Sequence, residues 1–141
     1  MFEIEGRMFG SYVGGLPHFI LYFVVAIALL AIFVTVYFRL TAHDELRLIR
    51  DGNLAAVLAL GGSMVGFVLP LSKSVAQATS IPDMLIWGFA AFIVQILSYL
   101  VCRILVPGLS EKIDNGQAAT GLLIATVAIS AGLLNAASMS L

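Results

Sequence analysis

Four long apolar runs, each nearly free of charged residues, constrain this chain more than any other feature. They cover residues 19–38, 54–71, 84–106 and 118–141. A helix needs about 20 apolar residues to cross a bilayer, with a range of roughly 17–25. A backbone in lipid must also satisfy its own hydrogen bonds, so each run is expected to be helical. The sequence therefore predicts an all-α membrane protein with four transmembrane helices.

The composition supports this class. Hydrophobic residues make up 61% of the chain and charged residues 11%, whereas an average soluble domain has roughly 25% charged residues. Too few charges are present to cover a surface in water. We therefore treat residues 1–141 as one transmembrane domain, with the bilayer as its surroundings.

The basic residues predict an orientation. Five of them lie in the two connections that follow the first and third runs, and they are Arg39, Arg47, Arg50, Arg103 and Lys112. The opposite side has only Arg7 and Lys73. Because cytoplasmic loops carry more Lys and Arg, these connections should face the cytoplasm and both termini should lie outside it. Anionic lipid headgroups or a cytoplasmic protein could meet the five cations, while nucleic acid is not expected as a partner.

The chain also contains a weak internal repeat. The stretch "IRDGNLA" at 49–55 returns as "IDNGQAA" at 113–119, between apolar runs in both cases. We expect two tandem helical hairpins, about 18–74 and 82–138, arranged as a parallel repeat. A short interfacial helix is expected in each cytoplasmic connection, with Leu46 and Ile49 on one face of the first. At the repeat corners Gly52, Asn53, Gly116 and Gln117, a turn and a helix cap are the simplest interpretation, and ligand binding is the alternative.

A few polar residues interrupt the apolar runs. Gln95, Ser98 and Cys102 fall on one face of the third predicted helix, and Asn135 lies near the end of the fourth. Hydrogen bonds between packed helices would explain them, and a face lining a pore is the alternative. His18 and His43 lie at opposite predicted interfaces, where we expect both to be anchors.

Small residues form a stripe along the second and fourth runs. The two stripes are Ala55, Ala59, Gly62 and Gly66, and then Gly121, Ala125, Ala128 and Gly132. Small residues let helix backbones approach closely in lipid. We expect both stripes to pack helices, and the sequence leaves open whether they do so within one chain or between chains.

Several stretches resemble a known family. They are "GNLAAVLALGGSMVGFVLPL", "WGFAAFIVQILSYLVCRILVP" and "EKIDNGQAATGLLIATVAISAGLLNAASM". Together they resemble the YjfL-type bacterial inner-membrane proteins, the domain-of-unknown-function family numbered three-fifty. The resemblance covers about residues 18–141, and it implies a duplicated two-helix unit in the inner (cytoplasmic) membrane. It implies no activity. Family members often have Cys near the end of the last helix, where this chain has Ser138.

Two functions fit these observations. The first is a self-associating membrane scaffold or partner-binding subunit, which agrees with the small-residue stripes and the absence of charge inside the runs. The second is an oligomeric conduit for an ion or small solute, which would need the Gln95 face to line a path. No enzyme motif and no metal-ligand spacing is recognisable, so we expect neither catalysis nor a metal or cofactor.

Overall fold

The computed structural model describes residues 1–139, which form six helices and no strand. The helices are α1 (Phe2–Leu40), α2 (Glu45–Arg50), α3 (Leu54–Gln77), α4 (Ile81–Leu105), α5 (Leu109–Asp114) and α6 (Ala118–Ser138). Four of them, α1, α3, α4 and α6, are long and apolar enough to cross a membrane. The prediction of an all-α chain with four such helices is therefore confirmed for the described residues; the end of the last run, 140–141, lies outside them.

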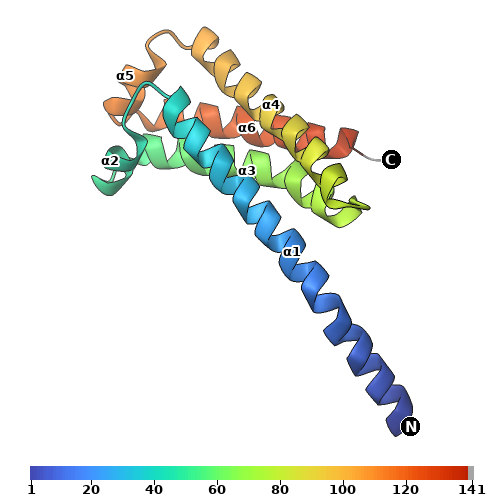
Figure 1. The fold of residues 1–141 in the computed structure, drawn as a ribbon. Coiled ribbons are helices and arrows are strands. Elements are labelled where there is room, and N and C mark those ends of the chain that lie inside the picture. Colours follow the sequence, from blue (N-terminus) through green and yellow to red (C-terminus); the bar gives the residue numbers. More distant parts are fainter. Residues whose placement is uncertain (140–141) are drawn as a thin grey trace.

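The centre of the fold is the contact between α3 and α6 (Figure 1). The two helices run in the same direction, because Gly121 meets Ala55 near their starts and Gly132 meets Gly66 further along. Helix α4 packs against both, while α1 packs against α3 and α4 and makes less extensive contacts. The core therefore consists of α3, α6 and α4, with α1 at its edge.

Helix α1 differs most from expectation. We expected the first helix to begin near residue 19, but it begins at Phe2 and has 39 residues. At about 1.5 Å per residue it is about 58 Å long, roughly twice the hydrocarbon thickness of a bilayer. Its N-terminal half leaves the bundle (Figure 1), and residues 1–21 are exposed.

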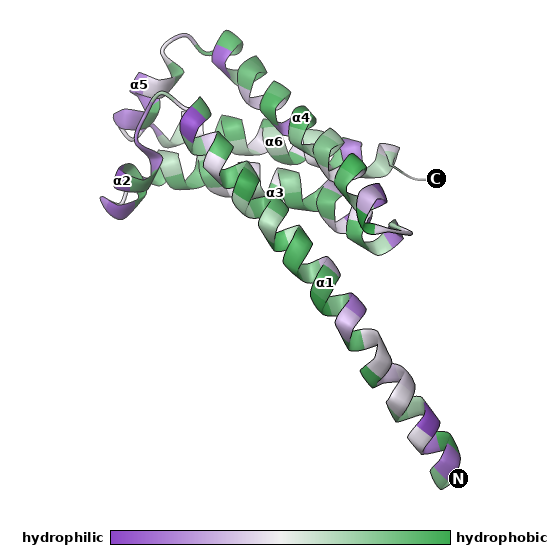
Figure 2. Ribbon diagram, viewed as in Figure 1, coloured by the Kyte–Doolittle hydropathy of each residue, from purple (hydrophilic) through white to green (hydrophobic). Residues whose placement is uncertain are grey.

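The early start of α1 has a local cause. Glu3 and Glu5 lie in the first turn, where acidic residues interact favourably with the helix dipole. Arg7 is 3.9 Å from Glu3 one turn away, a spacing that supports a helix. These residues are polar (Figure 2), so an apolar run alone cannot locate the start of this helix.

The other long helices depart less from their predicted ends. Helix α3 continues past residue 71 to Gln77, although Pro70 lies inside it. The Ser74 hydroxyl donates to the Met84 carbonyl (3.2 Å), which joins the last turns of α3 to α4. Helix α4 begins at Ile81, because the Ser80 side chain caps it by accepting a bond from the Asp83 amide (3.3 Å).

Candidate functional site

The two small-residue stripes face each other within one chain. All eight residues are buried, and they are Ala55, Ala59, Gly62, Gly66, Gly121, Ala125, Ala128 and Gly132. A Cβ atom added to Gly62 would overlap Ala125, and one added to Gly121 would overlap the backbone of Ala55. We call this contact the α3–α6 seam. Leucine at either glycine could not fit unless the helices separated.

The seam also places glycine hydrogens against carbonyl oxygens. A Cβ atom at Gly132 would point at the Gly66 carbonyl oxygen, and one at Gly66 would point at the Ala128 carbonyl oxygen. Glycine has a hydrogen in that direction, so both pairs are aligned for Cα–H···O contacts. Pro70 has no amide hydrogen, so it cannot donate to Gly66 four residues earlier. Helix α6 covers the carbonyl that Pro70 leaves free.

The polar face of α4 turns toward this seam. Gln95, Ser98 and Cys102 are all buried. The Gln95 amide donates to the Ala128 carbonyl of α6 (3.1 Å), and the Ser98 hydroxyl donates to Val94 within its own helix (2.8 Å). Gln95 is 3% exposed, which leaves it enclosed by α3, α4 and α6. Asn135 lies further along α6, and its side-chain nitrogen is buried without a hydrogen-bond partner among the described residues.

The two repeat corners have the same backbone geometry. Gly52 and Gly116 have φ values of 82° and 75°, in the left-handed region that glycine adopts at low cost. Their amides donate to the carbonyls of Ile49 (3.0 Å) and Ile113 (2.9 Å). The next amides, of Asn53 and Gln117, donate to Leu48 (2.8 Å) and Lys112 (3.0 Å). Both short helices therefore end in a Schellman motif.

The side chains at the two corners differ. Asn53 caps α3 by accepting a bond from the Ala56 amide (3.0 Å), and its own amide group donates to the Ile113 carbonyl at the end of α5 (2.8 Å). Gln117 occupies the matching position before α6 and makes no capping bond. Asn53 therefore ties one connection to the other, and Gln117 does not.

The predicted basic residues gather at one end of the bundle, which we call the connection end because it carries α2 and α5 (Figure 2). Arg39, Arg47, Arg50 and Arg103 are exposed and Lys112 is half-buried. Their exposure leaves them available to an anionic surface or partner.

The sequence did not reveal a buried pair at the same end. His43 was expected to be an interfacial anchor, but it is 7% exposed, and Glu45 is 2% exposed. Their side chains are fully enclosed, and His43 Nε2 lies 2.5 Å from Glu45 Oε1. The expectation for His43 is therefore wrong, because the connection folds inward before α2 begins.

The pair lies among other polar side chains. Glu45 interacts electrostatically with Tyr37 of α1 and Tyr99 of α4, whose rings meet edge to face at 5.6 Å. Within the described residues, two buried atoms of the pair have no hydrogen-bond partner, His43 Nδ1 and Glu45 Oε2. Each unsatisfied buried group costs roughly 1–3 kcal/mol.

Sequence patterns did not predict the burial of His43 and Glu45. Helix α2 has six residues, too few to show a helical period. Leu46, which was expected to share one face of this helix with Ile49, is exposed, and the buried residues of α2 are Glu45 and Leu48. The equivalent position in the second connection, 64 residues later, is Leu109, which begins α5 and is also buried. This internal repeat was the one sequence signal that could have indicated a buried side chain at position 45.

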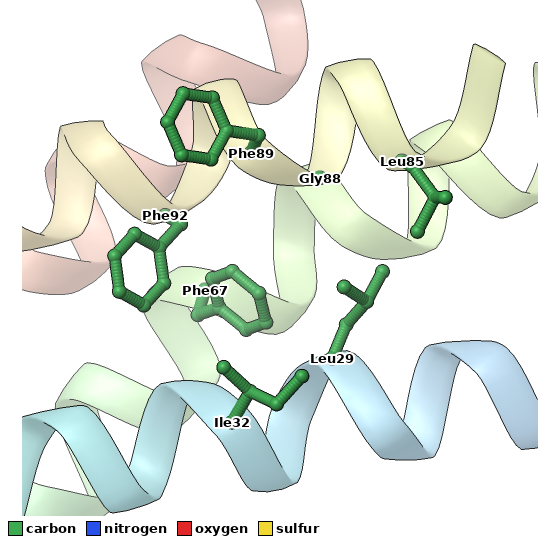
Figure 3. Close-up of a pocket in the computed structure, with 7 residues that line it drawn as sticks. All are labelled: Leu29, Ile32, Phe67, Leu85, Gly88, Phe89 and Phe92. Carbon is green, nitrogen blue, oxygen red and sulfur yellow. The ribbon is translucent and has the colours of Figure 1, made fainter. Parts of the chain in front are cut away.

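An apolar groove lies between α1 and α4, with Phe67 of α3 at its base (Figure 3). Its volume is about 410 Å³, and it is lined by Leu29, Ile32, Phe67, Leu85, Gly88, Phe89 and Phe92. Gly88 keeps it open, since a Cβ atom there would come within 3.1 Å of Leu29. The walls present no polar side chain that could select a ligand.

Comparison with known proteins identifies the family. A family described as Domain of Unknown Function (DUF350) matches residues 11–139. The UPF0719 inner membrane protein YjfL of Escherichia coli (strain K12) is 41% identical over 119 residues, which cover 84% of this chain and 90% of that protein. The UPF0719 transmembrane protein YshE of Bacillus subtilis (strain 168) is 29% identical over 120 residues, with the same coverage. No solved structure matches. The chain belongs to the DUF350 family of membrane proteins.

Proposed function

We propose that this chain is a multi-pass inner-membrane protein that associates with itself and serves as a scaffold or partner-binding subunit, without catalysis of its own. The observation that carries the proposal is the N-terminal half of α1, which extends from the bundle with residues 1–21 exposed. A helix of this length that is packed along only half of itself offers a surface to a second chain.

The interior supports a scaffold better than a conduit. A conduit would need the Gln95 face to line a path, but Gln95 is enclosed and bonded to α6. At the seam, the backbones of α3 and α6 are in direct contact beside the Gln95 side chain. Because the seam uses both predicted stripes within one chain, self-association needs another surface.

Helix α1 offers such a surface. Residues 8–38 contain no Asp, Glu, Lys or Arg, so about 45 Å of helix can lie in hydrocarbon if α1 is tilted. Gly6, Gly10 and Gly14 recur every four residues, and nothing lies within 4 Å of the Cβ position of any of them. Small residues at this spacing favour helix pairing in lipid, and we assign this stripe to contact with the same helix of a second copy.

The finer topology follows the internal repeat. Helices α2 and α5 begin and end 64 residues apart and close with the same Schellman motif, and α3 runs parallel to α6. These features support two tandem hairpins with α2 and α5 as interfacial helices. The excess of basic residues at the connection end favours the cytoplasmic side for α2 and α5 and the outside for both termini. The exposed arginines would then face anionic headgroups or a cytoplasmic partner.

The test is the number of copies per particle in lipid nanodiscs, counted by stepwise photobleaching. We expect the wild type to contain two or more copies and Gly10→Leu/Gly14→Leu to contain one. Gly15→Leu is the matched control, because it adds the same side chain to another face of the same segment, and it should keep the wild-type number.

A wild type with a single copy would overturn the proposal. A double variant that keeps the wild-type number would show that α1 does not mediate association.

A further inference from the structure

The two short helices at the connection end carry opposite charges at equivalent positions. In α2, Arg47 and Arg50 are exposed, and the residues 64 positions later in α5 are Glu111 and Asp114, which are exposed as well. The members of each pair are three residues apart, so they lie on one side of their helix. We propose that the arginine face of α2 in one copy binds the acidic face of α5 in a second copy. This inference rests on the self-association proposed above and names a contact within the assembly.

The fold directs both faces away from its core. The buried residues of α2 are Glu45 and Leu48, and those of α5 are Leu109 and Ile113. Both helices lie at the connection end of the bundle (Figure 2). Two copies that lie side by side in a membrane with the same orientation therefore present the arginine face and the acidic face on the same side of the bilayer.

The four charges are not paired within one chain. Among residues 1–139, none of them takes part in an ion pair. Asp44 and Asp51 flank the arginines in the sequence, but the Asp44 carboxylate accepts a bond from the Arg47 backbone amide (3.3 Å) and does not pair with a guanidinium. Arg103 lines the same hollow as Glu111 without forming an ion pair with it. Both faces are therefore available to a partner.

A second copy is the partner that fits both faces at once. Guanidinium groups bind carboxylates with two parallel hydrogen bonds, and every copy supplies one face of each kind. Two copies related by a twofold axis can thus make the contact twice. An anionic lipid headgroup would suit the arginines of α2, but it would repel the carboxylates of α5. The arginine face of a neighbour neutralises those carboxylates instead.

The contact is secondary to the pairing of α1. Ion pairs between exposed side chains are individually weak, and salt screens them. They form between copies that α1 already holds at a high effective concentration. The contact between α2 and α5 therefore sets how neighbouring copies are oriented, and α1 sets whether they associate.

The experiment is cross-linking in the membrane between two co-expressed forms of the full chain that carry different affinity tags. One form has Leu46→Cys beside the arginine face, and the other has Asn115→Cys beside the acidic face. Both positions are exposed, whereas the native Cys102 is 1% exposed and should not react. A short bismaleimide should join the two forms. Cross-linking of the Leu46→Cys form with itself measures chance contact, since two arginine faces repel each other.

Charge reversal tests whether the ion pairs hold the two helices together. Arg47→Glu/Arg50→Glu in the first form should lower the cross-linked fraction roughly tenfold, because attractive pairs become repulsive. Glu111→Arg/Asp114→Arg in the second form should then restore it. The restored cross-link also shows that both reversed forms fold. An arginine reversal without effect would overturn the contact.

The number of copies per nanodisc separates this inference from the proposed function. Two or more copies without the cross-link would overturn the contact between α2 and α5 and leave self-association in place, whereas a single copy would overturn both. A cross-link that is lost on arginine reversal and is not restored by the second reversal would assign the arginines to lipid headgroups and overturn the contact.

Discussion

The two connections of this protein, residues 41–53 and 106–117, follow the same path with different chemistry. Each holds a six-residue helix, and each ends at a glycine in the left-handed region. The first carries His43, Glu45 and Asn53, where the second carries Pro107, Leu109 and Gln117.

This difference separates what the fold requires from what it permits. The shared features are a left-handed glycine, a buried residue at the start of the short helix and a Schellman end, so they are sufficient to build the turn. The turn does not require the polar side chains that are present in the first connection. One of them, Asn53, adds bonds between the connections, and the other two form the enclosed pair.

The largest expected effect concerns the α3–α6 seam, which fixes the position of α3 relative to α6. Gly132→Leu would place a side chain on the Gly66 backbone. The cost should exceed the roughly 1–3 kcal/mol of ordinary overpacking, and we expect no stable fold. Gly61→Leu is the matched control, because nothing lies within 4 Å of its Cβ position. Unfolding in dodecyl sulfate, followed by circular dichroism, measures both. Similar stability for the two variants would disprove the close contact.

The next effect comes from exchanging Glu45 and Leu109. Leu109→Glu buries a carboxylate without a histidine beside it, which should lower the free energy of unfolding by about 3–5 kcal/mol. Glu45→Leu leaves the enclosed His43 Nε2 without an acceptor, so it should lower the free energy of unfolding by a smaller amount, about 1–3 kcal/mol. The same unfolding assay applies. If Glu45→Leu destabilises the protein as much as Leu109→Glu, the two positions are not structurally equivalent and the pair has a stabilising role.

The smallest effect compares the two caps. Asn53→Ala removes a cap and a bond to the Ile113 carbonyl, and it should lower the free energy of unfolding by about 2 kcal/mol. Gln117→Ala removes no capping bond, so its effect should stay within about 0.5 kcal/mol. Equal effects in the unfolding assay would contradict the asymmetry between the corners.

The sequence was most informative where one physical requirement dominates. Long apolar runs located four helices, because a backbone in lipid has no alternative donors or acceptors. The cap at Asn53 also followed from a local pattern. The start of α1 was missed because its polar first turns continue a helix that hydropathy alone cannot trace.

The candidate sites were harder to predict. Gln95 could be placed on an inward face, but its partner could not, since Ala128 lies on another helix. His43 and Glu45 lie next to charged and exposed residues such as Asp44 and Arg47. A polar residue in such a stretch is normally solvated, and no short-range pattern indicated that the chain would turn inward.

The sequence by itself therefore determined the class of protein, the number of long helices and the glycine turns, because these depend on hydropathy and backbone conformation within a few residues. The tertiary structure decided that the small-residue stripes meet within one chain, that Gln95 is enclosed and that Glu45 is buried. Those outcomes depend on which distant surfaces come together, and in this chain the close approach of α3 and α6 sets that arrangement.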